Sequence, residues 1–246
     1  MLVMMYGCLM VVTQEAMTAA SNLVERAFPS SSFGDRLRIG RKAQLGENLV
    51  YRSGIGIDGA LTYGEFDLTF FSTLVDRALE DVAQPATLID VGSGVGRLCF
   101  AATQLWPQVQ CAGVECLPEL HKIAVDTVER LMLDGDQAST SLASLRFYCK
   151  RAELLLHPGG LLDCENAVYF AYSSAFESEG DELSDFSLMC SWLREGTRVI
   201  TTDKRLVSVD GLWKFELIEQ IDGANVGTGG QSTGYIYEVV QSRRSM

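Results

Sequence analysis

Residues 88–115 place the strongest constraint on the fold of this chain. The apolar run Leu88–Val91 leads into a turn that is rich in glycine, and a helical pattern then extends to Leu105. A second apolar run, Cys111–Glu115, follows this helix. Nearly continuous apolar runs are typical of parallel strands that are covered on both faces. The segment therefore predicts a strand–helix–strand unit within a parallel α/β sheet.

The glycine spacing in this unit distinguishes between classes of nucleotide cofactor. Gly92, Gly94 and Gly96 read G-x-G-x-G. Turns that bind dinucleotides usually read G-x-G-x-x-G, because a diphosphate must sit on the helix N-terminus. Here the third position of that pattern holds Arg97, whose side chain is too large for the close packing it requires.

Acidic residues at both strand ends point to a cationic cofactor. Asp90 lies two residues before Gly92, where its carboxylate would repel a diphosphate but suits the ammonium of a methionyl group. Glu115 ends the second strand, at about the spacing where an acid meets a ribose hydroxyl. These features favour S-adenosylmethionine over a dinucleotide. The alternative is an ordinary tight turn in a doubly wound sheet.

The rest of the chain shows helical and strand patterns in alternation. We expect helices over residues 1–28, 66–82, 117–133 and 181–194, the last ended by Gly196. We expect further strands over residues 145–151, 167–172, 197–202, 213–221 and 233–240, the final two joined by the glycine-rich segment 223–234. Two strands with no helix between them predict a mostly parallel sheet that ends in an antiparallel hairpin.

Residues 33–62 read as an irregular stretch. They contain the basic cluster of this acidic protein, Arg36, Arg38, Arg41 and Lys42. This cluster is either a solvated connector or a lid that contacts substrate. We therefore divide the chain into a helical and irregular N-terminal extension, residues 1–62, and a main domain, residues 63–246.

Composition excludes several classes of protein. The net charge of −12 counts against strong binding to nucleic acid or to an anionic membrane. The seven cysteines are odd in number and form no C-x-x-C pair, which is typical of reduced thiols in an intracellular protein. With only two histidines and no ligand spacing, we expect no metal site.

The first residues, Met1–Val12, are apolar but lack a basic leader region and an evident cleavage site. They are too few to span a bilayer as a helix. We interpret them as the start of an N-terminal helix that packs on the domain; a degenerate targeting signal or a misassigned start codon are the alternatives. The nucleus and the cytoplasm fit equally well, and an organellar address stays open.

Several motifs together resemble one enzyme family. The motifs are Tyr63-Gly64-Glu65, the loop Asp90–Gly96, Gly113-Val114-Glu115 followed by Pro118-Glu119-Leu120, and Leu193–Ile200. They resemble class I S-adenosylmethionine-dependent methyltransferases. More narrowly, they resemble the non-SET histone lysine methyltransferases of the disruptor-of-telomeric-silencing family. The resemblance covers roughly residues 60–205 and implies a seven-stranded, Rossmann-like methyltransferase sheet.

The resemblance also implies roles for individual residues. Tyr63 and Glu65 would close over the methionyl end of S-adenosylmethionine. Asp90 and the loop residues Gly92, Ser93, Gly94 and Val95 would flank its amino-acid portion. Glu115 would hold the ribose hydroxyls, and Glu153 would lie near the adenine.

The acceptor side departs from that family. After the fourth strand the histone enzymes have Asn-Asn-Phe-Ala-Phe, whereas this chain reads Tyr172-Ser173-Ser174-Ala175-Phe176. The candidate catalytic residues at this loop are Tyr172, Ser173 and Phe176. The basic nucleosome-binding region of many such enzymes has no counterpart apart from Arg36–Lys42 and Arg243-Arg244.

The expected activity is methyl transfer, to a lysine amine of a histone or of another protein. Tyr169, Phe170, Tyr172 and Phe176 could line a dry channel opposite Tyr63, although Tyr169 and Phe170 also fit simple core packing. The alternatives are a small-molecule methyltransferase on the same core, a pseudoenzyme that binds the cofactor, and a nicotinamide-dependent oxidoreductase. The oligomeric state stays open.

Overall fold

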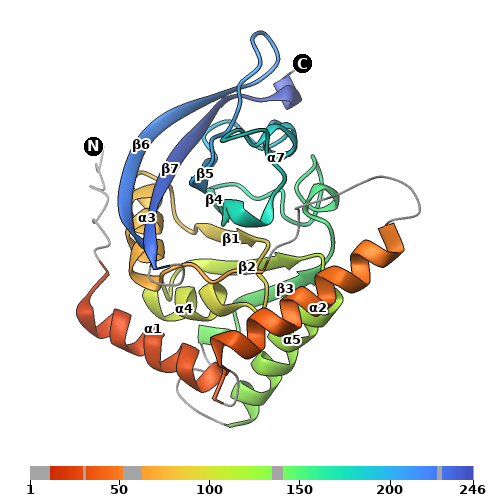
Figure 1. Ribbon diagram of the computed structural model, residues 1–246. Coiled ribbons are helices and arrows are strands. Elements are labelled where there is room, and N and C mark those ends of the chain that lie inside the picture. Colours follow the sequence, from red (N-terminus) through yellow and green to blue (C-terminus); the bar gives the residue numbers. More distant parts are fainter. Residues whose placement is uncertain (1–11, 30–31, 52–62, 135–140, 226–228, 246) are drawn as a thin grey trace, which may run out of the picture.

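The computed structural model describes residues 12–29, 32–51, 63–134, 141–225 and 229–245. Its centre is a seven-stranded sheet with the order β3-β2-β1-β4-β5-β7-β6 (Figure 1). The strands are β1 (Thr87–Val91), β2 (Gln110–Glu115), β3 (Leu145–Cys149), β4 (Ala167–Ala171), β5 (Arg198–Thr202), β6 (Lys214–Asn225) and β7 (Gly230–Gln241). The first five pair in parallel, and β7 pairs antiparallel with both β5 and β6. The expected mostly parallel sheet with a C-terminal antiparallel hairpin is therefore confirmed.

The helices of the described residues cover both faces of this sheet. They are α1 (Gln14–Ala27), α2 (Phe33–Tyr51), α3 (Leu68–Leu79), α4 (Arg97–Leu105), α5 (Pro118–Leu133) and α7 (Ser184–Cys190), with short 3₁₀ turns η1 (Ala152–Leu154), η2 (Ser173–Ala175) and η3 (Arg243–Ser245). Figure 1 shows α1 and α4 on one side of β1 and α7 on the other. None of the described helices is both long enough and apolar enough to cross a bilayer.

Alternation along the parallel strands assigns side chains to these two layers, because successive strand residues point to opposite faces. Leu88 and Phe170 belong to the core that contains α1, α3 and α4. Their neighbours Ile89 and Tyr169 belong to the core that contains α7. In β1 and β2 the buried acids lie near the carboxyl ends, Asp90 as the fourth of five residues and Glu115 as the last, and the site lies at this edge of the sheet.

One expectation about the N-terminal extension is wrong. Residues 33–51 form the helix α2 rather than an irregular stretch. A reciprocal cap begins this helix: the Ser32 hydroxyl accepts from the Asp35 backbone N–H, and the Asp35 carboxylate accepts from the Ser32 N–H, both at 3.2 Å. Glycines within the helix weaken its sequence pattern, because glycine is a poor helix former. The remaining residues, 52–62, lie outside the described residues, as does most of the apolar segment Met1–Val12.

Two other boundaries differ from the sequence expectation. The helix α7 covers Ser184–Cys190 rather than 181–194, since the chain before it pairs with a distant segment: the Leu183 N–H donates to the Arg205 carbonyl at 2.9 Å. The glycine-rich segment 223–234 belongs largely to the strands of the hairpin rather than to a loop. The local sequence pattern predicts neither the contact between Leu183 and Arg205 nor the pairing of the two hairpin strands.

Candidate active site

A cavity of about 600 Å³ opens at the carboxyl ends of β1 and β2. This is the edge of a parallel sheet where ligands usually bind, and the volume lies within the ordinary range for small-molecule sites. Ten of the residues named from the sequence line it: Tyr63, Glu65, Asp90, Gly92, Ser93, Gly94, Glu115, Glu153, Tyr172 and Phe176. Residues from distant parts of the chain thus meet in one wall.

The glycine loop is bent sharply and fixed to the neighbouring strand. Gly92 and Gly94 have φ angles of +83° and +56°, in the left-handed region that favours glycine. The N–H groups of Gly92 and Ser93 donate to the Val114 carbonyl at 2.8 and 2.9 Å. The loop is therefore held against β2, and its backbone forms part of the cavity wall.

Glu115 is buried at the end of β2. Its carboxylate accepts from the Gly94 N–H and from the Leu117 N–H, each at 2.8 Å, one through each oxygen. Burial raises the pKa of this carboxyl, and the two backbone hydrogen bonds oppose that shift. Because an ionised carboxylate accepts several hydrogen bonds, each oxygen retains capacity for a ligand hydroxyl.

Asp90 is the second acid in the wall, and only 3% of its surface is exposed. Burial raises the pKa of Asp90 to about 7, and the charge of Glu115 adds to this increase. A hydrogen bond from the Cys99 thiol to Asp90 Oδ2, at 3.7 Å, opposes it. The two carboxylates therefore face one cavity closely enough to influence each other. That arrangement is unfavourable for an anionic ligand and favourable for a cationic one.

A buried hydroxyl completes this end of the cavity. Ser93 is 8% exposed and lines the wall, and within the described residues its Oγ has no hydrogen-bond partner. This Oγ lies against β2, where a Cβ added at Gly113 would be 2.7 Å from it. With two carboxylates and a glycine bend, the donors and acceptors here fit a nucleoside with a cationic amino-acid arm.

Arg97 is a further charged residue of the wall, which sequence reasoning noted only as too large for a dinucleotide turn. It is the first residue of α4, whose N-cap, Gly96, has no side chain to cap the helix. One guanidinium nitrogen, Nη1, donates to the Phe66 carbonyl at 2.7 Å. A guanidinium at a helix N-terminus favours a negatively charged group such as a carboxylate.

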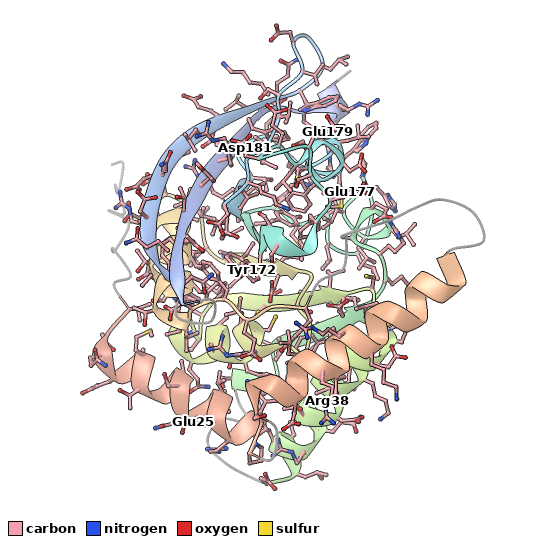
Figure 2. All side chains as sticks on the ribbon, viewed as in Figure 1. Glu25, Arg38, Tyr172, Glu177, Glu179 and Asp181 are labelled. Carbon is pink, nitrogen blue, oxygen red and sulfur yellow. The ribbon has the colours of Figure 1, made fainter. Side chains whose placement is uncertain are left out.

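The opposite part of the wall is aromatic. The Tyr172 ring packs on Phe66 at 5.2 Å, and the Phe176 ring on Phe186 at 4.6 Å, measured between ring centroids. Figure 2 shows Tyr172 near the centre of the molecule and Glu177 above it, on the segment that leads into α7. Glu177 and Asp185 also line this part of the cavity. Phe186, Asp185 and the nearby Trp192 were not identified from the sequence, because their approach depends on how the α7 segment folds back.

Two of the named residues lie elsewhere. Ser173 is fully buried: its N–H donates to Thr202 Oγ1 at 3.2 Å, and its Oγ accepts from the Thr202 N–H at 3.1 Å, which joins the ends of β4 and β5. Val95 packs in a small apolar cluster under α2. The structure therefore places neither side chain in the cavity wall.

Three more placements concern the remaining aromatic residues and Glu153. Tyr169 and Phe170 are buried in the two cores, so they pack rather than line a channel. Glu153 lines the cavity but is half-exposed and pairs with Arg151. It lies at the rim, on the turn η1 that follows β3.

Comparison with known proteins gives likenesses of fold. No protein-family model and no curated protein matches the chain. Among solved structures it is similar to the tRNA methyltransferase TrmK of B. subtilis, with 15% identity over 74% of this chain and 70% of that one and a TM-score of 0.45. It is also similar to geranyl diphosphate C-methyltransferase of Streptomyces coelicolor A3(2), with 11% identity over 70% and 79% of the two chains and a TM-score of 0.48. Likenesses at this level assign no substrate, and neither concerns a protein lysine methyltransferase.

Proposed function

We propose that this chain is an S-adenosylmethionine-dependent methyltransferase. The observation that supports the proposal is the pair of buried carboxylates, Asp90 and Glu115, which face one cavity across a glycine bend. A dinucleotide would bring a diphosphate against these acids, and the repulsion makes the oxidoreductase alternative unfavourable. A cationic cofactor would instead gain from both.

The wall residues divide the binding of such a cofactor among them. Glu115 would accept from the ribose hydroxyls, Asp90 would pair with the methionyl ammonium, and Arg97 would pair with the methionyl carboxylate. When bound, S-adenosylmethionine supplies an electrophilic methyl group and a neutral leaving group.

The chain itself needs to contribute alignment and desolvation. Orientation of the reacting groups can supply on the order of 7–11 kcal/mol of the barrier. Tyr172, Phe176 and Phe186 would exclude water around an incoming amine and so lower its pKa, which favours the unprotonated form that attacks the methyl group. The amine nitrogen forms a bond to the methyl carbon as the carbon–sulfur bond breaks, and the amine loses one proton to solvent.

We further propose that the acceptor is an amine of a protein lysine, in a histone or in another protein. The carboxylates of Glu177 and Asp185 lie on the acceptor side of the cavity. They would attract a cationic side chain to the mouth, while the aromatic wall beyond them would desolvate it. A small-molecule amine shares this chemistry, so the acceptor needs a direct test.

The first experiment is thermal unfolding of the full chain with S-adenosylhomocysteine or NAD. We expect about 2.7 kcal/mol of stabilisation at a hundredfold excess of S-adenosylhomocysteine over its Kd, and none with NAD. Asp90→Asn and Gly94→Ala should both reduce this stabilisation. In Gly94→Ala the new Cβ would lie 2.7 Å from the Tyr63 ring.

Gly211→Ala is the matched control for the glycine variant. Gly211 also has a positive φ, +74°, but nothing lies within 4 Å of an added Cβ. Both alanine variants should therefore lose about 1–2 kcal/mol of stability from backbone strain, but only Gly94→Ala should lose ligand binding. Unchanged stabilisation by S-adenosylhomocysteine in both Asp90→Asn and Gly94→Ala would refute the site.

The acceptor is then tested with cofactor that carries a radiolabelled methyl group. Nucleosomes, a protein extract and a metabolite pool are the three acceptor preparations. Label recovered as methyl-lysine after protein hydrolysis supports the proposal, and label confined to the metabolite pool overturns the protein acceptor. Cofactor binding without transfer to any preparation favours the pseudoenzyme.

A further inference from the structure

The helix α2 packs against both loops that carry the proposed cofactor site. Its side chains Leu37 and Ala43 share an apolar cluster with Val95 of the glycine loop and with Leu117, which follows Glu115. In Figure 1 α2 runs alongside α5, and the two helices are in contact. A segment that lies far before the glycine loop in the sequence is thus built onto it.

A stack of close contacts continues from α2 into the cavity. At Gly40 of α2 an added Cβ would lie 2.3 Å from the Cβ of Tyr63, so only glycine allows this approach. On its other side the Tyr63 ring lies against the glycine loop, where a Cβ on Gly94 would be 2.7 Å from Cε2. Tyr63 is therefore held between α2 and the loop, and it cannot shift without moving one of them.

A buried ion pair reinforces this stack. The Arg36 guanidinium on α2 donates through Nε and Nη2 to the two carboxylate oxygens of Glu65, the second bond at 3.0 Å. The Tyr63 hydroxyl donates to the same carboxylate at 2.9 Å, and Arg97 Nε lies 3.6 Å from it. The Arg36 and Glu65 side chains are only 11% and 10% exposed.

The other basic residues of this cluster behave differently. Arg38 is 78% exposed, and its ion pair within the described residues is local, with Asp35 on the same helix; Figure 2 labels it on α2. Arg41 and Lys42 are also exposed. The basic cluster thus consists of three solvated side chains and the inward guanidinium of Arg36. Neither a solvated connector nor a substrate-contacting lid describes all of it.

We infer that Arg36 is a positioning residue for the cofactor: it fixes Glu65 and Tyr63 against the glycine loop and so makes α2 part of the site. The inference rests on the proposed function. The two hydrogen bonds from the Arg36 guanidinium hold the Glu65 carboxylate in one orientation at the cavity wall. A lysine ammonium, which acts as a point charge, would fix that orientation less well. With Tyr63 and Glu65 held in place, bound cofactor leaves the cavity slowly.

The test is the dissociation rate of S-adenosylhomocysteine from the full chain, measured well below the unfolding temperature. We expect Arg36→Met to raise this rate and the Kd about tenfold, a change equivalent to about 1.4 kcal/mol. Arg36→Lys should recover part of the loss, because it restores the charge without the bidentate geometry. Arg38→Met, two residues along the same helix, should leave both quantities unchanged.

Two outcomes distinguish this inference from the proposed function. If the wild-type chain does not bind S-adenosylhomocysteine, the proposed function fails. If the wild type binds but folded Arg36→Met releases the ligand at the wild-type rate, only the role of Arg36 fails. Should Arg36→Met not fold, Gly40→Ala is the second variant: it displaces Tyr63 without removing a charge, and wild-type release from it would overturn the inference equally.

Discussion

At the scale of single residues, Asp90 shows a conflict between stability and binding. Its carboxylate is buried, and its pKa is raised to about 7 because burial disfavours the charged form. The folded chain therefore binds a proton that the unfolded chain releases, and ionisation of Asp90 lowers stability as pH rises from about 4 to 7. A purely structural residue at this position would be apolar, so the acid indicates a ligand.

Asp90 predicts opposite pH effects on stability and on affinity. Its ionisation should cost the apo protein up to about 1.4 kcal/mol per pH unit between these limits. Affinity for S-adenosylhomocysteine should instead increase from pH 6 to pH 8, because the charged carboxylate pairs with the ammonium. Asp90→Asn should remove this pH dependence and match or exceed wild-type apo stability at pH 8, as measured by calorimetric titration and denaturant unfolding. A pH-independent affinity in the wild type would contradict the assignment.

At the scale of elements, the hairpin shows how glycine marks close packing rather than a loop. An added Cβ at Gly223 of β6 would lie 2.4 Å from Phe70, and one at Gly234 of β7 would lie 2.3 Å from Leu74. Both partners belong to α3. The two glycines thus let α3 lie directly on the hairpin, and the same helix follows the segment that carries Tyr63 and Glu65.

Gly234→Ala should therefore destabilise the chain by overpacking, by about 1–3 kcal/mol. The contact is with the end of the Leu74 side chain, so Leu74→Ala should relieve it. In a double-mutant cycle of unfolding free energies, the pair should cost less than the sum of the two single variants. Strict additivity would show that the glycine serves the backbone and not the packing against α3.

At the scale of the whole molecule, Asp163 joins its own loop to two distant segments. Its carboxylate forms an ion pair with Arg244 of η3 at 2.7 Å, and it accepts hydrogen bonds from Arg194 after α7 at 2.8 Å and from the Gly159 N–H at 2.9 Å. Burial alone would raise its pKa, but these bonds outweigh burial and hold the pKa of Asp163 below its ordinary value. The cluster fixes the C-terminal residues beside Trp192, which lines the cavity.

Asp163→Asn should lower the unfolding free energy at pH 7 by about 1–3 kcal/mol, because hydrogen bonds to a charged group are lost. A carboxyl with a depressed pKa stabilises the folded state above its unfolded pKa and loses that effect as pH falls. The difference between wild type and variant should thus shrink below about pH 4 in acid denaturation series. Glu165→Gln is the control: Glu165 is exposed and 3.5 Å from Arg194, so its effect should stay within about 0.5 kcal/mol.

Local sequence was sufficient for the central sheet and for one half of the site. Strands buried on both faces produce unbroken apolar runs, and a left-handed bend requires glycine, so Leu88–Glu115 could be interpreted without a partner. The acids Asp90 and Glu115 follow from their place at the strand ends. Because parallel strands share one carboxyl edge, the convergence of these two residues was predictable as well.

Only the tertiary structure decided which distant segments complete the cavity. Arg36 could not be assigned from the sequence, because nothing local distinguishes it from Arg38. The difference arises when α2 packs on Tyr63 and Arg36 forms its ion pair with Glu65, whereas Arg38 stays exposed. Likewise, Ser173 and Ser93 are both serines near strand ends, yet the Ser173 side chain joins β4 to β5, whereas Ser93 lines the cavity. Spacing along a strand or helix depends on local geometry, whereas burial and charge pairing depend on contacts that form only when the chain is folded.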